Sequence, residues 1–429
     1  MSTTVEVFEH ETLHVGRPLR TIDGREVRLT DRHFDDLVRF NDTHGGRFFK
    51  VGHRRISMTE HVGYVEVGNL AIEILPKADR TSEGRGTERA WRDVLLEMLS
   101  VASGLRLELP TSASQRTGRS SLLELVAARF VEEVNVLLHQ GLAKGYRDDE
   151  QNGPTFRGRL VVAEHLRANI ARGDRFYVRT QTYDPDTALN RILGAALDEV
   201  SELGMGPGIA ARVAECRASF PDVREMRVTG ETFDRVRLGR TTARYENALV
   251  LARMLLEHSG PQLRAGRSKV FALLFDMNVL WERYVAALFR RAARDGLEVS
   301  TQERHPFWRG GVHRRGVRPD IVVRARAGKE VLLIADTKWK VIGDGPPGDD
   351  DLQQMFVYNE LLGGGRAVLI YPGAGGASGG SARGDYVGRT HGCETVQLAL
   401  VEAARSCTAG MREHVISVLT TLGTDTPTA

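Results

Sequence analysis

Hydrophobic and polar positions alternate in the N-terminal part of the chain. Over residues 61–77, apolar side chains alternate with their neighbours on both sides of a Gly68-Asn69 turn, and the pattern stops at Pro76. Alternation around a short glycine-containing turn is typical of a β-hairpin. We therefore expect a β-rich N-terminal module over residues 1–82.

The period then changes from two to between three and four residues. From Trp91 to about His258, apolar residues recur at three- and four-residue spacing, most clearly over 122–145, as they do on amphipathic helices. A mainly helical middle region is therefore expected over 83–264. Shorter elements expected in these two regions are a helix over 34–40, helices over 189–203 and 245–257, and a strand over 155–162.

The last region, 265–429, mixes both periods and is expected to form an α/β domain with a mixed sheet. The elements expected, in order, are a long helix over 270–296, strands over 317–325 and 330–340 joined as a hairpin through 326–329, a helix over 351–362, a buried strand over 366–372, a flexible loop over 373–385 and a final helix over 398–422. Together the three regions predict an α+β, multidomain fold.

Composition narrows the class of protein only modestly. No run approaches the roughly 20 apolar residues of a membrane-spanning helix, and no secretory leader is visible, so we do not expect the protein to associate with a membrane. The three cysteines are scattered, which argues against a disulfide framework or a zinc site and favours the cytoplasm. The net charge of +3 is small, but arginines crowd residues 304–326. That stripe suits either a polyanion or an ordinary solvated surface.

The strongest chemical pattern lies in the expected hairpin. Asp320 begins the first strand, and Asp336 and Lys338 end the second, which is strongly apolar up to that point. Because strand side chains alternate, Asp336 and Lys338 share one face of the sheet. Two carboxylates can bind Mg²⁺, and a lysine beside them can orient a water or offset charge on a phosphate. The alternative is a turn aspartate and a strand-end ion pair.

Two flanking features extend this pattern. Glu282, on the long helix before the hairpin, could bind the metal directly or through water, or could be a solvated glutamate. Gln354 and Tyr358, at i and i+4 on the following helix, could bind a phosphate or hold Lys338, or could be ordinary half-buried side chains. Phe307 and Trp308 are expected to form a core aromatic pair before the hairpin, and the alternative is that they stack on a base.

At these residues the sequence resembles the PD-(D/E)XK nuclease superfamily and, within it, the McrC family of nuclease subunits from McrBC modification-dependent restriction systems. The segments that carry the resemblance, in order, are GNLAIEILPK, FRGRLVV, DTALNRIL, FDMNVLWERYV, RPDIVV, LLIADTKWK, DLQQMFVYNELL and AVLIYP. The resemblance implies an Mg²⁺-dependent DNA endonuclease of an antiviral restriction system. Its catalytic residues would be Asp320, Asp336 and Lys338, assisted by Glu282, with Gln354 and Tyr358 as the Q-x-x-x-Y pair that contacts substrate.

The resemblance also implies two partners. These are DNA that carries methylated or otherwise modified bases, and a McrB-like AAA+ hexamer that hydrolyses GTP and is stimulated by the McrC-like chain. The sequence itself contains no G-x-x-x-x-G-K-[ST] phosphate-binding loop, so nucleotide hydrolysis would belong to the partner. Arg157 and Arg159 are candidates for contact with the ring, or simply surface arginines beside a turn glycine.

Two other functions remain open at this point. One is a non-catalytic adaptor that switches on a AAA+ motor, which would keep its activity without Asp336. The other is a stand-alone RecB-like nuclease, which would cleave without a partner. An iron–sulfur relative of that second kind is disfavoured because four cysteines are lacking.

Overall fold

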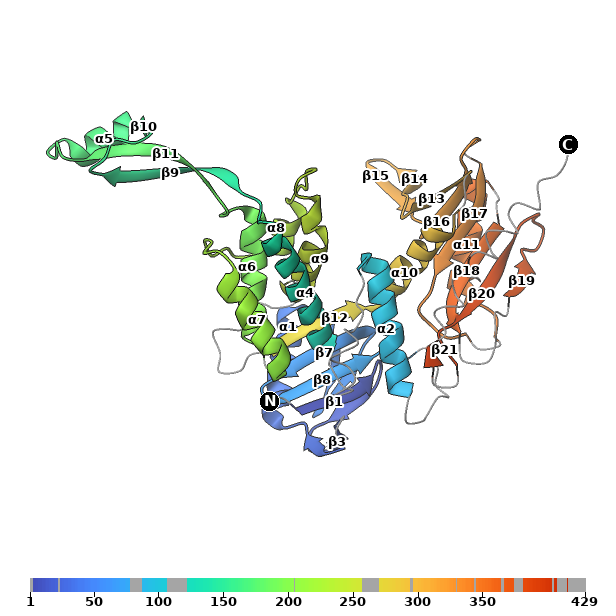
Figure 1. Ribbon diagram of the computed structural model, residues 1–429. Helices are drawn as coiled ribbons and strands as arrows, with labels where there is room; N and C mark the ends of the chain where they lie inside the picture. Colours follow the sequence, from blue (N-terminus) through green and yellow to red (C-terminus); the bar gives the residue numbers. More distant parts are fainter. Residues whose placement is uncertain are drawn as a thin grey trace. The chain divides into compact units, whose positions relative to one another are not determined.

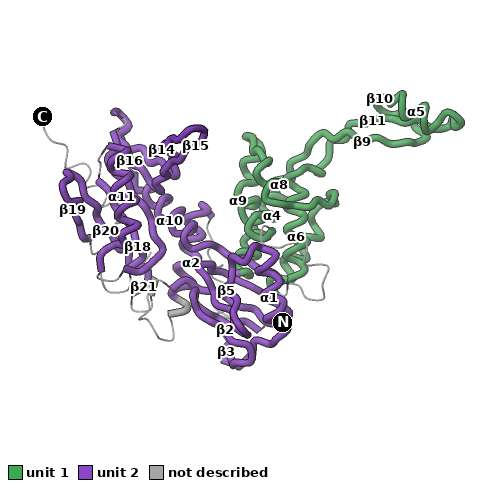
Figure 2. Tube along the Cα trace, turned by 180° about the vertical axis from the view of Figure 1, so that it is seen from behind, with its two compact units in different colours: residues 1, 123–262 green, residues 2–122, 263–429 purple. Residues whose placement is uncertain are grey.

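The computed structural model places the chain in two compact units (Figure 2). The residues described below are 3–21, 24–77, 87–105, 122–203, 205–256, 270–293, 296–328, 330–342, 345–363, 366–373, 381–402, 405–406 and 415. One unit comprises residues 123–262, and the other comprises residues 2–122 together with 263–429. The N-terminal β module and the C-terminal α/β region therefore belong to the same unit.

The N-terminal part of that second unit is built on a four-stranded sheet in the order β1-β8-β7-β12. The hairpin expected from the alternation is confirmed as β7 (His61–Val67) and β8 (Leu70–Leu75). β8 is buried along its whole length, including Glu73, which forms an ion pair with Arg92 of helix α2 (Thr87–Ser103). β1 covers Thr3–Phe8, and the elements around this sheet are β2 (Thr12–His14), β3 (Pro18–Arg20), β4 (Glu26–Arg28), α1 (Asp31–Thr43), β5 (Phe49–Gly52) and β6 (Arg55–Met58).

The prediction of one long helix over 270–296 is wrong for residues 270–276. Residues Val270–Asp276 form strand β12, which pairs antiparallel with β7, and helix α10 covers only Met277–Ala292. A short apolar run is compatible with either a buried strand or a buried helix, and here the open edge of β7 decides. Asp276 then caps α10 by accepting hydrogen bonds from the backbone N–H groups of Asn278 and Val279. The chain thus returns to the N-terminal sheet before it enters the C-terminal domain.

The C-terminal domain contains a six-stranded mixed sheet in the order β13-β16-β17-β18-β20-β19 (Figure 1). The expected hairpin is confirmed as an antiparallel pair, while β17-β18 and β18-β20 are parallel. α10 packs on β17, and α11 packs on β17, β18 and β20. The bounds are β13 (Leu297–Thr301), β16 (Ile321–Ala325), β17 (Val331–Thr337), α11 (Asp349–Leu362), β18 (Arg366–Gly373), β19 (Ser381–Asp385) and β20 (Gly392–Ala399).

Two expectations near the C-terminus need correction. Of the expected loop over 373–385, residues 374–380 lie outside the described residues, and residues 381–385 form strand β19 at the edge of the sheet. The expected helix over 398–422 begins instead with the end of β20, followed by β21 (Val401–Glu402) and β22 (Arg405–Ser406). Pairing with β18 outweighs the helical spacing there, and apart from residue 415 the rest of that segment lies outside the described residues.

The unit formed by residues 123–262 has a core of helices. It contains α4 (Leu122–His139), α6 (Ala188–Ser201), α7 (Pro207–Ser219), α8 (Gly230–Asp234), the short 3-10 helix η1 (Ala243–Tyr245) and α9 (Glu246–Leu256). The helices expected over 189–203 and 245–257 are thereby confirmed to within a few residues. Among the described residues, no helix of either unit is both long and apolar enough to cross a membrane.

A three-stranded sheet extends from these helices as an arm (Figure 1). It consists of β9 (Gly145–Gly153), β10 (Arg159–Leu160) and β11 (Phe176–Asp184), with the short helix α5 (Val162–Asn169) at its far end. The strand expected over 155–162 is present only as the two residues of β10. The two long strands were not expected: β9 (GYRDDEQNG) is mostly polar, and β11 (FYVRTQTYD) does not show a regular alternation of apolar and polar residues.

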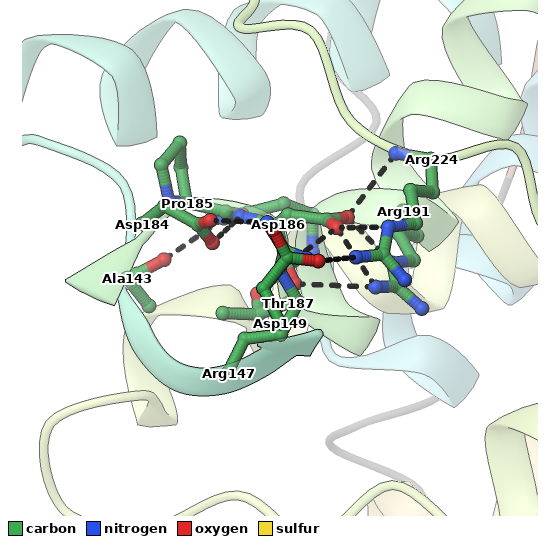
Figure 3. Close-up of polar contacts among 10 residues, drawn as sticks. Ala143, Arg147, Asp149, Asp184, Pro185, Asp186, Thr187, Arg191 and Arg224 are labelled. Carbon is green, nitrogen blue, oxygen red and sulfur yellow. Dashed lines mark hydrogen bonds and ion pairs between the residues drawn. The ribbon is translucent and has the colours of Figure 1, made fainter. Parts of the chain in front are cut away.

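Polar contacts fix the base of the arm to the helical core (Figure 3). Asp186, just after β11, accepts two hydrogen bonds from Arg191 of α6, at 2.6 and 2.9 Å, and forms an ion pair with Arg224 at 3.2 Å. Buried Asn190 donates to the backbone carbonyls of Ala143 and Pro185, which lie at the roots of the two long strands. The hydrogen bonds from Arg191 lower the pKa of Asp186, so the carboxylate stays ionised.

The close approach of β12 to β7 depends on a glycine. Gly63 has φ +135°, and a Cβ added there would lie 2.0 Å from the carbonyl oxygen of Leu273. We expect Gly63→Ala to lower the free energy of unfolding by about 3 kcal/mol or more, because both backbone strain and overpacking oppose it. Thermal unfolding followed by circular dichroism would measure the loss. Gly16→Ala, at φ +80° with nothing within 4 Å, is the control and should cost only about 1 kcal/mol. Equal losses for both variants would contradict this account of the β7–β12 contact.

Candidate active site

The hairpin register brings the two predicted aspartates together. Ile321 of β16 lies opposite Ala335 of β17, so Asp320 and Asp336 are neighbours at the same end of the pair. Asp320 Oδ2 accepts hydrogen bonds from the backbone N–H and the hydroxyl of Thr337, both at 2.8 Å. Asp336 is only 2% exposed, and its burial together with the nearby charge of Asp320 raises its pKa to about 7. Because the two carboxylates repel each other and Asp336 is buried, the ionised pair needs positive charge close by.

Lys338 supplies part of that charge from the same strand end. Its Nζ lies 2.7 Å from Asp336 Oδ2 and donates a hydrogen bond of 2.7 Å to Gln354 Oε1 on α11. Gln354 Nε2 in turn donates to the hydroxyl of Tyr358 at 2.7 Å, and that hydroxyl donates to the backbone carbonyl of Arg318. Two contacts were considered for the Gln354–Tyr358 pair, one with a phosphate and one with Lys338. The hydrogen bond between Lys338 and Gln354 corresponds to the second.

Glu282 joins the group through a residue that the sequence did not identify. Gln302 Nε2 donates to Glu282 Oε1 at 2.5 Å and to Asp320 Oδ1 at 3.0 Å, and so bridges the two carboxylates. Burial, and then the charge of Asp320, raises the pKa of Glu282. Gln302 has φ +57°, which non-glycine residues seldom adopt. No sequence pattern could find it, because its position depends on the pairing of β13 with β16.

These side chains line a pocket of about 270 Å³. Its lining includes five of the six predicted residues, four further polar or charged side chains and one valine, and in full it is Asn278, Val279, Glu282, Gln302, Arg318, Asp320, Asp336, Thr337, Lys338 and Gln354. Arg318 is exposed at the pocket, two residues before Asp320. It adds a guanidinium suited to a phosphate.

A second buried carboxylate steadies the lysine end of the site. Asp351, in the first turn of α11, is 2.6 Å from Lys340 Nζ and accepts a 2.7 Å hydrogen bond from the hydroxyl of Tyr371. Burial alone would raise the pKa of Asp351, but the hydrogen bonds from Lys340 and Tyr371, together with the positive charges of Lys340 and Lys338, outweigh it, and the pKa falls below its ordinary value. Lys338 Nζ lies 4.0 Å from the same carboxylate. The first turn of α11 therefore adds negative charge behind Lys338.

Trp339 ties the strand end to the N-terminal part of the same unit. Its indole N–H lies 3.0 and 3.1 Å from the two oxygens of Glu9, and the Glu9 side chain is 1% exposed. The backbone N–H of Lys77 also donates to Glu9, at 2.6 Å. Burial raises the pKa of Glu9 to about 7, although both hydrogen bonds act in the opposite direction. The segment that carries Lys338 is thus anchored on two sides.

The donor set suits a hard cation that uses few protein ligands. In the described part of the chain, no three His, Cys, Asp or Glu side chains form a ready metal cluster. Mg²⁺ does not require one, since it commonly binds one or two carboxylates and keeps its waters. Asp320 and Asp336 offer two, and Asp336 Oδ2 accepts no well-aligned hydrogen bond from a described residue although Lys338 Nζ is close. The carboxylates therefore fit such an ion chemically.

Other predicted residues lie away from this pocket. Arg157 and Arg159 are exposed on the arm, on either side of Gly158, whose φ is +94°. Phe307 and Trp308 were expected in a core pair, but both are about half exposed. They belong to a small hairpin of β14 (His305–Gly310) and β15 (His313–Val317), which ends just before the pocket.

Solved structures define the class of fold. A chain of the structure described as a refined half-complex from the tetradecameric assembly of Thermococcus gammatolerans McrB AAA+ hexamers with bound McrC matches with a TM-score of 0.68. The identity is 18%, and the match covers 98% of this chain and 100% of that one. A chain of the Thermococcus gammatolerans McrBC complex, solved by cryo-electron microscopy, matches with a TM-score of 0.50 at 20% identity, over 68% and 89% of the two chains. The fold is therefore a mixed α/β fold of the kind found in those complexes.

A family model identifies the chain more closely. The model described as McrBC 5-methylcytosine restriction system component matches residues 56–372, which is well over half of the chain and includes all six residues of the candidate site. No curated protein matches the sequence significantly. The chain belongs to the McrBC family.

The Glu9 contact predicts how stability depends on pH. The folded-state pKa of about 7 lies above the ordinary 4.5, so stabilisation by the protonated carboxyl is complete below about pH 4.5 and is lost as the pH rises through 7. Glu9→Gln removes the buried charge. We expect its melting temperature relative to the wild type to rise between pH 5 and pH 8.5, by an amount corresponding to at most roughly 3 kcal/mol.

Differential scanning fluorimetry across that pH range would measure the difference. Glu26→Gln, at an exposed position of β4, is the matched control and should follow the wild type at every pH. A constant difference between Glu9→Gln and the wild type would show that Glu9 does not titrate in this range.

Proposed function

We propose that this chain is the nuclease subunit of a McrBC-type restriction system and hydrolyses DNA phosphodiesters with Mg²⁺. The observation that carries the proposal is the meeting of Asp320, Asp336 and Lys338 at one end of the β16–β17 hairpin. The flanking α10 and α11, together with the mixed sheet, support a PD-(D/E)XK fold for this domain. Membership of the McrBC family supports the same activity.

Each residue has a role that its contacts suggest. Asp320 and Asp336 would hold the cation, which when bound supplies a Lewis acid beside the phosphate and an acidified water. Glu282 is placed to assist through Gln302, directly or through water. Lys338, fixed between Asp336 and Gln354, can present its ammonium group to a water or a phosphate oxygen without first having to be ordered.

The partners follow from the family and from the solved complexes. We propose that the chain acts on DNA carrying methylated or otherwise modified bases, together with a McrB-like AAA+ hexamer whose GTPase it stimulates. Nothing in the sequence supplies a nucleotide-binding loop of its own. The free thiols Cys216 and Cys393 suit the reducing cytoplasm, where we place this activity.

The arm favours a second function, contact with that hexamer. Its far end exposes apolar side chains that a free surface seldom gathers, namely Phe156, Val162, Leu166 and Ile170. Arg157 and Arg159 lie in the same stretch, exposed. An adaptor that only stimulates the motor would need this surface and not the pocket.

Asp336→Asn tests the nuclease activity. The substitution keeps the shape of the side chain but removes the charge, and we expect DNA cleavage with Mg²⁺ and the partner to fall at least about 100-fold. Circular dichroism should show the fold unchanged. Asp350→Asn is the matched control, because Asp350 is exposed on α11, and it should cleave like the wild type. Cleavage by Asp336→Asn at the wild-type rate would rule out the proposed mechanism.

The double variant R157A/R159A tests the partner role. We expect it to reduce stimulation of the hexamer's GTPase several-fold, whereas Asp336→Asn should stimulate normally. R20A/R28A, which removes two exposed arginines from the β3–β4 hairpin, is the control for charge alone. GTP hydrolysis measured with purified hexamer decides the matter. Normal stimulation by R157A/R159A would show that these arginines do not contact the hexamer. DNA cleavage in the absence of the hexamer would favour a stand-alone nuclease.

A further inference from the structure

The β14–β15 hairpin combines positive charge with exposed aromatic rings. The stretch 304–319 contains five arginines and two histidines but no Asp or Glu. Arg309, Arg314 and Arg315 are exposed, and no carboxylate in the described ranges pairs with any of them. The acidic residue just before the stretch, Glu303, is already paired with Arg324 at 2.7 Å. The charge of the hairpin is therefore available to a partner outside the chain.

Two large aromatic side chains lie beside these arginines, directly before Arg309 on the same strand, and Trp308 lies opposite Arg315. Phe307 is 52% exposed and Trp308 is 51% exposed, whereas Trp91 and Trp281 are buried. An exposed tryptophan beside arginines is costly to leave in water and is typical of a binding surface. Both rings lie on β14, where the register with β15 shifts between Pro306 and Trp308. A bulge of this kind redirects side chains out of the regular pleat.

The position of the Trp308 ring is defined by a glycine. A Cβ at Gly310 would lie 2.2 Å from Trp308 Cη2, so the indole lies against this glycine. Ring and backbone are thus packed together, although one side of the ring remains exposed.

The hairpin leads directly into the pocket. β15 ends at Val317, and the next residues are Arg318, which lines the pocket, and Asp320. The hairpin forms its own two-stranded sheet beside the six-stranded one (Figure 1). A polymer whose phosphate enters the pocket would have its neighbouring nucleotides within reach of the hairpin.

We infer that the β14–β15 hairpin is a DNA-binding element that holds the strand next to the cleaved phosphate. The inference rests on the proposed nuclease function and names the surface that engages its substrate. Arg309 and Arg314 contact backbone phosphates, and Trp308 stacks on an unpaired or unstacked base. Charge favours a nucleic acid over a protein partner, because the surface carries only positive charge. Stacking on a base is tolerant of sequence, so this contact would hold the strand without selecting a sequence.

The test is DNA binding by the full-length chain in EDTA, so that cleavage plays no part. Fluorescence anisotropy would compare a labelled duplex with the same duplex carrying one unpaired 2-aminopurine, over a range of salt concentrations. R309A/R314A should reduce the slope of log affinity against log salt by roughly 2, because two phosphate contacts are lost. R20A/R28A is again the matched control and should leave the slope unchanged.

Trp308→Ala should weaken binding to the DNA with the unpaired base by about 5- to 100-fold, with the salt slope unchanged. Gly310→Ala, which displaces the ring without removing it, should weaken binding in the same direction. Quenching of 2-aminopurine fluorescence by the wild type and not by Trp308→Ala would show the stack directly.

Two results would overturn the inference. One is wild-type DNA affinity and salt slope in all three variants. The other is normal DNA binding together with weaker capture of the AAA+ hexamer by Trp308→Ala, which would make the hairpin a protein interface. Both differ from failure of the nuclease proposal, which would appear as full cleavage by Asp336→Asn whatever the hairpin binds.

Discussion

The mutual proximity of two carboxylates at the end of one β-hairpin is the constraint on which the rest of the site depends. The register that pairs Ile321 with Ala335 brings Asp320 and Asp336 together, and the burial of Asp336, followed by the nearby charge of Asp320, raises the pKa of Asp336 to about 7. Such an arrangement is stable only if the surroundings compensate the charge. Lys338 and the backbone N–H of Thr337 do so in part. In the proposed mechanism a divalent cation would supply the remaining positive charge.

The neighbouring elements restrict this hairpin end from several sides. Gln354 holds the ammonium group of Lys338, and Tyr358 links Gln354 to the backbone just before Asp320. Glu9 holds Trp339, one residue after the lysine, from the N-terminal sheet. Because β12 completes that sheet and α10 follows it directly, the N-terminal module is a structural support of the site and not a separate appendage. Side chains fixed in advance lose little entropy when substrate binds.

The sequence predicted which side chains lie together better than it predicted the architecture around them. Asp320, Asp336, Lys338, Gln354 and Tyr358 follow from local periodicity, since each lies at a strand end or on one helix face. Gln302 does not, because only the pairing of β13 with β16 brings it to the carboxylates. Likewise, Val270–Asp276 is a strand because β7 offers an open edge, and β9 is a strand in spite of its polar sequence. Long-range pairing overrides local preference in each of these cases.

The arm of residues 145–184 is stabilised in a way that suits binding a partner more than catalysis. Its long strands are mostly polar and exposed on both faces, so burial of apolar area does little to hold them. Stability comes from backbone pairing along β9 and β11 and from the base, where Asn190 binds both strand roots and Asp186 binds Arg191 and Arg224. An element fixed at its base and apolar at its far end loses little freedom on association. That combination fits the contact with a AAA+ hexamer that we propose for the arm.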